Sequence, residues 1–243
     1  MAKKVKIQNS FQRFEKKYLL TRGQYEALLD GMEPYLEPDA YGRYTICNLY
    51  YDTDSYQLIR ASLEKPVYKE KLRVRSYGVP HDGDDVFVEL KKKVDGIVYK
   101  RRTVMEVTEA ADYLRGRVRP RLEDQSCREI DWFLHSYHPA PKGFLAYDRQ
   151  ALAGREDPAL RVTFDTGLRW REDRLDLRCG DDGAPILPDD QILMEVKIPG
   201  AAPVWLSHLL SETGVFPASF SKYGACYRQN LSDRPGKEAP FCA

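Results

Sequence analysis

The stretch Glu89-Leu-Lys-Lys-Lys-Val-Asp-Gly-Ile-Val-Tyr-Lys-Arg-Arg102 decides the fold of this chain. Glu89, Lys91 and Lys93 alternate with other residues before an Asp-Gly turn, and Lys100 and Arg102 alternate after it. Alternate residues of a β-strand point to opposite faces of the sheet, and a short turn of this kind joins two antiparallel strands. The stretch therefore predicts a β-hairpin that carries its cations on one face.

The same period of two recurs along the rest of the chain. Charged or polar residues alternate in Arg13-x-Glu15-x-Lys17, Arg73-x-Arg75, Tyr147-x-Arg149, Arg161-x-Thr163-x-Asp165 and Glu195-x-Lys197. The residues between them include Phe14, Val74, Val88, Leu90, Val162, Phe164, Met194, Val196 and Ile198. Each strand is therefore predicted to have one charged face and one apolar face.

Two arrangements explain these strands. The first is an antiparallel sheet with a solvated charged face and helices on its apolar face. The second is a barrel with helices and loops outside and a charged, water-filled lumen. Cations on nearly every strand favour the barrel, because they repel one another unless a polyanion such as a phosphate-rich ligand neutralises them.

Helical patterns separate the strands in five places. They are predicted from Thr21 to about Leu36, from Asp54 to Leu63, from Thr108 onward, from Ser126 to Tyr137, and from Val204 to Thr213, where Gly214 ends the helix. The segments 79–85 and 180–190 are rich in Gly, Pro and Asp and are predicted to be loops.

Composition excludes several classes of protein. The chain has 243 residues, and its 38 Lys and Arg nearly balance its 37 Asp and Glu, which argues against a general nucleic-acid-binding protein. The five Cys are widely spaced without a C-x-x-C motif, so neither a disulfide framework nor a structural zinc site is expected. The sequence contains no apolar run long enough to span a membrane and no signal peptide, so a cytoplasmic protein is expected.

The ordered set of motifs resembles the VTC domain, the polyphosphate polymerase domain of the triphosphate tunnel metalloenzyme (CYTH-like) superfamily. The matching segments are Phe11-Gln-Arg-Phe-Glu-Lys-Lys-Tyr18, Asn48-Leu-Tyr-Tyr-Asp-Thr53, Lys71-Leu-Arg-Val-Arg-Ser-Tyr-Gly78, Val86-Phe-Val-Glu-Leu-Lys-Lys-Lys93, Val98-Tyr-Lys-Arg-Arg102, Tyr147-Asp-Arg149, Arg161-Val-Thr-Phe-Asp-Thr166, Leu193-Met-Glu-Val-Lys197 and Ser219-Phe-Ser-Lys-Tyr223. The resemblance implies an α+β fold, an antiparallel eight-stranded β-tunnel (a closed barrel) with a charged lumen and helices outside. It also implies an N-terminal arm over 1–10, a single tunnel domain over 11–231 and a flexible tail over 232–243.

The resemblance also implies roles for individual residues. Catalytic roles fall on Lys17, Arg73, Arg75, Lys91, Lys100, Arg149 and Lys222. Phosphate-binding roles fall on Arg13, Lys93, Arg102, Tyr147, Arg161, Lys197 and Ser221. Glu195 matches the metal-binding glutamate and is expected to hold Mn²⁺ or Mg²⁺. Glu15 and Glu89 are expected to orient lysines rather than to bind a metal.

Two positions depart from the family pattern. Hydrolases of the superfamily begin with Glu-x-Glu-x-Lys, whereas Arg13 stands at the first of these positions and favours the polymerase branch. Some polymerases carry a lysine where this chain has Ser219. No P-loop motif occurs, so side chains are expected to hold the phosphates.

Three functions stay open at this point. The first is an ATP-dependent polyphosphate polymerase that transfers the γ-phosphoryl group to a growing chain. The second is a metal-dependent triphosphatase that hydrolyses nucleoside triphosphate or tripolyphosphate. The third is a non-catalytic polyphosphate-binding module. ATP and inorganic polyphosphate are the expected partners, without nucleic acid and without membrane insertion, and any coupling to a membrane would need a separate protein.

Overall fold

The computed structural model describes residues 14–95, 97–121, 124–198 and 200–230. Its strands are β1 (Phe14–Thr21), β2 (Leu36–Asp52), β3 (Tyr68–Tyr77), β4 (Asp85–Val94), β5 (Ile97–Glu106), β6 (Ala140–Gly154), β7 (Arg161–Arg171), β8 (Ala184–Pro185) and β9 (Gln191–Ile198). Its helices are α1 (Arg22–Met32), α2 (Gln57–Leu63), α3 (Val107–Leu114), α4 (Gln125–Tyr137), α5 (Val204–Glu212) and α6 (Lys222–Asn230).

The strands form one sheet in the order β1-β9-β7-β6-β2-β3-β4-β5, and β8 pairs with β7 at its side. The pairings of β1 with β9, β2 with β3, β3 with β4, β4 with β5, and β7 with β9 are all antiparallel. The predicted antiparallel sheet of at least eight strands is therefore confirmed. Over the described residues the order runs from β1 to β5 without a pairing that closes it, so the closed barrel stays a prediction.

The chain divides into two compact units. The first contains residues 1–43, 150–165 and 190–219, and the second contains 44–149, 166–189 and 220–243. The long strands β2, β6 and β7 contribute residues to both units. The boundaries of the predicted single domain stay a prediction, and the predicted arm (1–10) and tail (232–243) lie outside the described residues.

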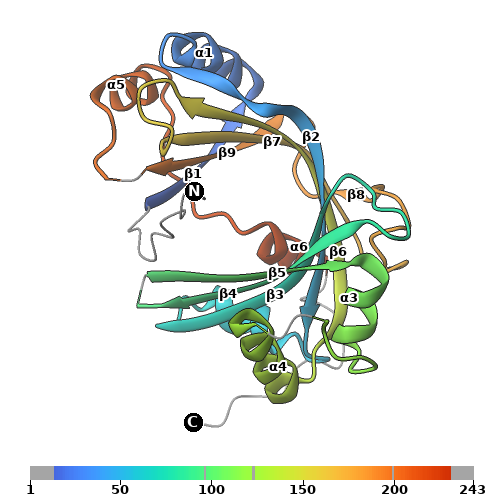
Figure 1. Ribbon diagram of the computed structural model, residues 1–243. Coiled ribbons are helices and arrows are strands. Elements are labelled where there is room, and N and C mark those ends of the chain that lie inside the picture. Colours follow the sequence, from blue (N-terminus) through green and yellow to red (C-terminus); the bar gives the residue numbers. More distant parts are fainter. Residues whose placement is uncertain (1–13, 96, 122–123, 199, 231–243) are drawn as a thin grey trace, which may run out of the picture. The chain divides into compact units, whose positions relative to one another are not determined.

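In the first unit, helices α1 and α5 cover the apolar face of β1, β9 and β7 (Figure 1). Phe164, Met194 and Val196 pack there against Leu28 of α1 and Leu206 of α5. Helix α1 begins as predicted, because the Thr21 hydroxyl accepts a hydrogen bond from the backbone N–H of Gln24 at 3.3 Å. In return the Gln24 side chain accepts one from the backbone N–H of Thr21 at 3.0 Å, which completes a capping box.

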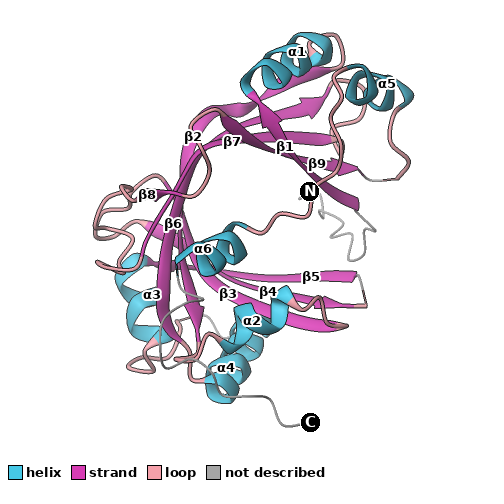
Figure 2. Cartoon of the chain, turned by 180° about the vertical axis from the view of Figure 1, so that it is seen from behind, coloured by secondary structure: helices cyan, strands magenta, loops and turns pink. Residues whose placement is uncertain are grey.

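In the second unit, helices α3 and α4 cover one face of β3, β4 and β5, and α6 lies on the other face (Figure 2). Leu72, Val88 and Leu90 pack beneath Ile130 and Phe133 of α4. The apolar members of the alternation therefore make the core, as the sequence predicts, and the charged members lie on the face that α6 shares.

Two helix predictions need correction. The helix predicted from Asp54 begins instead at Gln57, because the Asp52 carboxylate accepts the backbone N–H groups of Leu58 and Ile59, both at 3.0 Å. Helix α6 was not predicted, since Gly224 weakens the helical pattern. A side chain at Gly224 would meet Leu63 of α2 at 2.9 Å, so the glycine allows the two helices to approach closely.

Candidate functional site

The charged face of the second unit contains two rows of side chains across β3, β4 and β5. Lys71, Lys91 and Lys100 are directly opposite one another in the register and form the first row. Arg73, Glu89 and Arg102 form the next row. Directly opposed residues point to the same face, and like charges in such positions destabilise a sheet. The lysine row therefore concentrates positive charge on this face, and Lys100 pairs there with Glu89 at 2.7 Å.

Glu89 is the centre of the second row, and only 1% of its side chain is exposed. Its Oε2 accepts hydrogen bonds from Nε and Nη2 of Arg73 at 2.9 and 2.7 Å. Its Oε1 accepts one from Nε of Arg102 at 2.8 Å and lies 2.7 Å from Nζ of Lys100. Burial alone raises the pKa of Glu89, but the charges of Arg73, Arg75 and Lys100 outweigh burial and hold that pKa below its ordinary value.

The same surroundings favour the charged form of Glu89 but the neutral form of Lys100. Partial burial, with 43% of the side chain exposed, and repulsion from Arg102 and Arg73 outweigh the attraction to Glu89 and together lower the pKa of Lys100 to about 8. The charge of Lys100 therefore changes within the pH range in which enzymes are usually studied.

Arg75 is held by two neutral side chains. Its Nε donates to Oδ1 of Asn48 at 3.0 Å, and its Nη2 donates to the Tyr147 hydroxyl at 3.3 Å. Asn48 is fixed in turn because its Nδ2 donates to the backbone oxygen of Leu145 at 3.1 Å. The guanidinium of Arg75 is thus oriented by two neutral groups, and its Nε forms a longer ion pair with Oε2 of Glu89 at 4.0 Å.

Helix α6 contacts both arginines through tyrosines. The ring of Tyr223 stacks on Tyr50 with centroids 4.6 Å apart, and Arg73 donates to the Tyr50 hydroxyl at 3.3 Å. Lys222, whose residue is 8% exposed, places Nζ 4.5 Å from the centroid of the Tyr147 ring. Arg149 lies over the same ring at 5.2 Å.

Just before α6, Ser221 meets the lysine row. Lys71 donates from Nζ to the Ser221 hydroxyl at 3.2 Å. Ser221 and the following Lys222 therefore lie on the charged face of the second unit.

The first unit carries a smaller charged group on β1, β9 and β7. Lys17 lies opposite Glu195 in the register, and its Nζ is 3.2 Å from Oε1 of Glu195 and 3.7 Å from Oε1 of Glu15. Lys197 is opposite both Glu15 and Arg161. Arg161 also donates to Asp39 at 3.1 Å.

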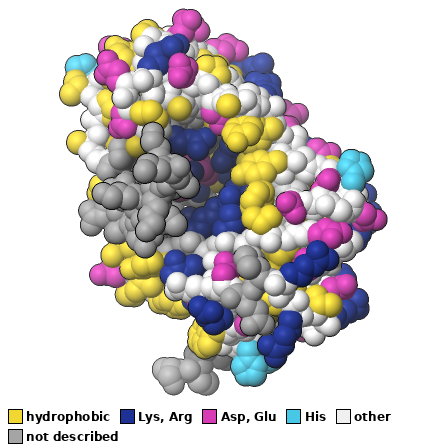
Figure 3. Space-filling model, viewed as in Figure 1, with side chains coloured by type: hydrophobic (Ala, Val, Ile, Leu, Met, Phe, Trp, Pro, Cys, Tyr) yellow, Lys and Arg dark blue, Asp and Glu magenta, His cyan; other side chains and the backbone are white. Residues whose placement is uncertain are grey.

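The predicted site residues fall into two sets. The second unit holds Arg73, Arg75, Lys91, Lys93, Lys100, Arg102, Tyr147, Arg149, Ser221 and Lys222. The first unit holds Lys17, Arg161, Glu195 and Lys197, and Arg13 lies outside the described residues. On the face shown in Figure 3, Lys and Arg side chains (dark blue) gather in groups rather than spreading evenly.

The sequence analysis missed three residues of the second unit. Tyr50 and Asn48 orient the paired arginines, and Lys71 belongs to the lysine row. Lys71 continues the alternation of Arg73 and Arg75, which was a usable signal. Tyr50 and Asn48 lie in the family-matching segment 48–53, but an uncharged residue on a strand does not reveal its partner across the sheet.

The residues around Glu195 fit a divalent ion. Thr163 is opposite Glu195 in the register, and its buried hydroxyl has no hydrogen-bond partner among the residues that the structure describes. A carboxylate and a hydroxyl are the hard oxygen donors that Mg²⁺ and Mn²⁺ accept. The described residues contain no group of three or more His, Cys, Asp or Glu that could hold a metal, so phosphate and water would complete the coordination.

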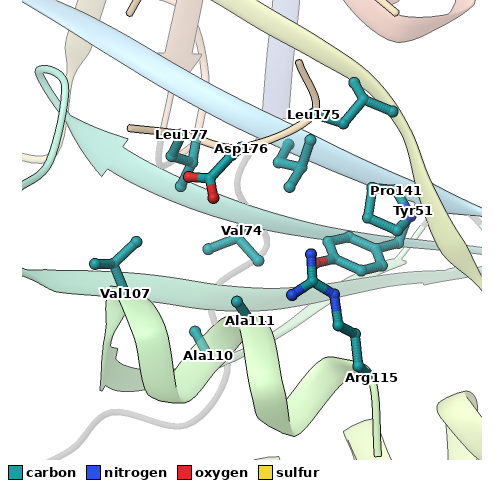
Figure 4. Close-up of a pocket in the computed structure, with 11 residues that line it drawn as sticks. Tyr51, Val74, Val107, Ala110, Ala111, Arg115, Pro141, Leu175, Asp176 and Leu177 are labelled. Atoms are coloured by element: carbon teal, nitrogen blue, oxygen red, sulfur yellow. The ribbon is translucent and has the colours of Figure 1, made fainter. Parts of the chain in front are cut away.

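A separate pocket lies on the helix-covered side of the second unit. It is lined by Tyr51, Val74 and Ala110, with Arg115 and Asp176 at its edge (Figure 4). Its lining is mostly apolar and includes none of the predicted site residues. We therefore assign the candidate site to the charged face and not to this pocket.

Comparisons with known proteins identify the family and the fold of this chain. A family model described as the VTC domain matches residues 12–230. A putative adenylate cyclase from Bacillus halodurans is 14% identical, with a TM-score of 0.53 over 85% of this chain and 92% of that chain. A putative adenylyl cyclase from Hippeastrum, described as having a dominant triphosphatase activity, is 16% identical, with a TM-score of 0.51 over 89% of this chain and 95% of that chain.

Curated proteins yielded no match. At these identities the two solved structures establish the fold alone. Among the described helices, none has the length and apolar character needed to cross a membrane.

Proposed function

This chain belongs to the VTC domain family, and on that premise we propose that it is an ATP-dependent polyphosphate polymerase. In this proposal the terminal oxygen of a polyphosphate chain attacks the γ-phosphorus of ATP. The bond between that phosphorus and the β–γ bridging oxygen breaks, and ADP leaves. The products are ADP and a chain one phosphate longer.

The observation that carries the proposal is the pair of cationic rows on β3, β4 and β5. Alternate residues of a strand lie about 7 Å apart, so Arg75, Arg73 and Lys71 extend over about 14 Å along β3. Such a face suits a chain of phosphates, because the closely spaced cations of Lys71, Lys91 and Lys100 attract its negative charges.

The residues have distinct chemical tasks. Arg73 and Arg75 each present a planar guanidinium that binds two phosphate oxygens at once, whereas the lysines act as point charges. These cations stabilise the negative charge that spreads over the transferring group, which is the main catalytic requirement of phosphoryl transfer. No protein nucleophile is required, because the acceptor oxygen belongs to the substrate.

Glu195 would hold the divalent metal, with the Thr163 hydroxyl beside it. The bound ion supplies further positive charge to the phosphate oxygens. Lys17, at 3.2 Å, orients the Glu195 carboxylate before the ion arrives.

The test is incubation with ATP and Mn²⁺ or Mg²⁺, followed by gel analysis of polyphosphate and an assay of free phosphate. We expect long chains from the native protein and none from Lys91→Ala. Arg155→Ala is the matched control, because it removes an exposed cation that pairs with Glu37 at 3.1 Å in the first unit. Release of phosphate without chains would refute polymerisation.

A metal-dependent triphosphatase is the second candidate. The structural likeness to the Hippeastrum protein, which is described as having a dominant triphosphatase activity, favours it. The same assay separates the two candidates, and binding of tripolyphosphate without any turnover would indicate a binding module.

A further inference from the structure

We propose that Glu89 is a positioning residue that occupies, before substrate binds, the place of a phosphate anion among Arg73, Arg102 and Lys100. This inference rests on the proposed function, because it concerns how the same charged face receives its substrate. It assigns Glu89 a role beyond orienting a single lysine.

The contacts of Glu89 support this role. Both of its oxygens are already used, Oε2 by Arg73 at 2.7 Å and Oε1 by Lys100 at 2.7 Å and Arg102 at 2.8 Å. These three cations come from β3 and β5, on either side of the strand that carries Glu89. Their charged groups therefore converge on one oxyanion that the protein itself supplies.

Phosphate oxygens compete for the same donors. A guanidinium binds carboxylate and phosphate in the same two-point geometry, so a phosphate that reaches Arg73 or Arg102 takes over N–H groups that Glu89 held. The Glu89 carboxylate is buried and ionised, and it repels the incoming anion.

Two opposing effects follow. The negative charge of Glu89 weakens the binding of phosphates, but it keeps the cations arranged for the transition state. Removing the charge while keeping the shape should therefore strengthen ground-state binding and slow turnover. A residue that only stabilises the fold would not move these two quantities in opposite directions.

The test compares Glu89→Gln with the native protein. Binding of tripolyphosphate is measured by calorimetry without metal, and turnover of ATP is measured with metal. We expect Glu89→Gln to bind tripolyphosphate at least about 10-fold more tightly, because a nearby like charge is gone. We expect kcat for ATP to fall about 100-fold, because the cations lose their fixed arrangement.

Glu129→Gln is the matched control. Glu129 of α4 lies 2.7 Å from Nε of Arg101 and 3.2 Å from Nζ of Lys92, and both cations point to the opposite face of the same strands. The control removes a carboxylate that pairs with two cations of the same strands, and we expect it to leave binding and turnover near their native values.

Weaker or unchanged binding by Glu89→Gln would overturn the proposal. If that variant does not fold, Glu89→Asp replaces it, because it keeps the charge but shortens the reach by one methylene. Native affinity with reduced kcat would then support the proposal, and native kcat would overturn it. The calorimetric comparison does not depend on the product, so a native protein that makes no polyphosphate contradicts the proposed function and not this inference.

Discussion

At the scale of single residues, the ion pair between Arg73 and Glu89 changes what the loss of Arg73 is expected to do to stability. Cations crowded on one face should repel, so removing one should cost little stability. The structure instead gives Arg73 two hydrogen bonds to the buried carboxylate of Glu89. Loss of Arg73 therefore leaves a buried anion short of partners.

We expect Arg73→Ala to lower the free energy of unfolding by about 2 kcal/mol, since hydrogen bonds to charged groups contribute on that order. Urea denaturation monitored by circular dichroism measures the change. Arg155→Ala, at an exposed ion pair, should change the free energy of unfolding by less than about 1 kcal/mol. Unchanged stability in Arg73→Ala would mean that relief of repulsion balances the lost bonds.

Lys100 gives a prediction about pH. Its protonated form attracts phosphate, and burial lowers its pKa to about 8, so the charge is present below that pH and is lost above it. We expect the affinity for tripolyphosphate to fall as the pH rises through 8. Lys100→Arg keeps its charge over the whole range and should show a flatter profile. Equal slopes for the two proteins would exclude Lys100 as the group that titrates.

At the scale of elements, the strands could be predicted from the local alternation of residues. The contacts between side chains of different strands could not be predicted in this way. The strands and their charged faces were predictable because alternation is local, and the Thr21 cap was predictable because its partner is three residues away. The hydrogen bonds that the two oxygens of Glu89 accept were not predictable, because they depend on the register of three strands. Helix α6 was missed because Gly224, which weakens its helical pattern, is needed for contact with α2.

Gly183 provides a test at this scale. A Cβ there would lie 2.5 Å from the backbone oxygen of Trp170, at the point where β8 pairs with β7. Backbone atoms cannot move aside cheaply, so we expect Gly183→Ala to destabilise the protein by about 1–3 kcal/mol. Thermal unfolding measures the loss.

Gly23→Ala is the control for Gly183→Ala. At Gly23 of α1, no other side chain or neighbouring element among the described residues comes within 4 Å of a Cβ. We expect this substitution to stabilise the protein by about 0.5–1 kcal/mol, because alanine favours a helix more than glycine does. Equal effects of the two substitutions would show that the approach of Gly183 to Trp170 is not tight.

At the scale of the whole molecule, the proposed tasks divide between the two units. The first unit contains Glu195, and the second contains Arg73, Arg75 and the lysine row. Glu195→Gln should therefore abolish metal-dependent turnover while tripolyphosphate still binds to the cations of the second unit. Calorimetry and the phosphate assay check both halves of this prediction. Native turnover in Glu195→Gln, or in excess chelator, would contradict the assignment of the metal.

The division of the chain between the units has a consequence for how such a protein can arise and be taken apart. The polypeptide passes from one unit to the other near residues 43, 149, 165, 189 and 219. No continuous piece of the gene encodes either unit, so recombination cannot exchange one unit as a single DNA segment. A protease that cuts the chain at one of these passages leaves four others intact, and nicked protein should stay together until it is denatured.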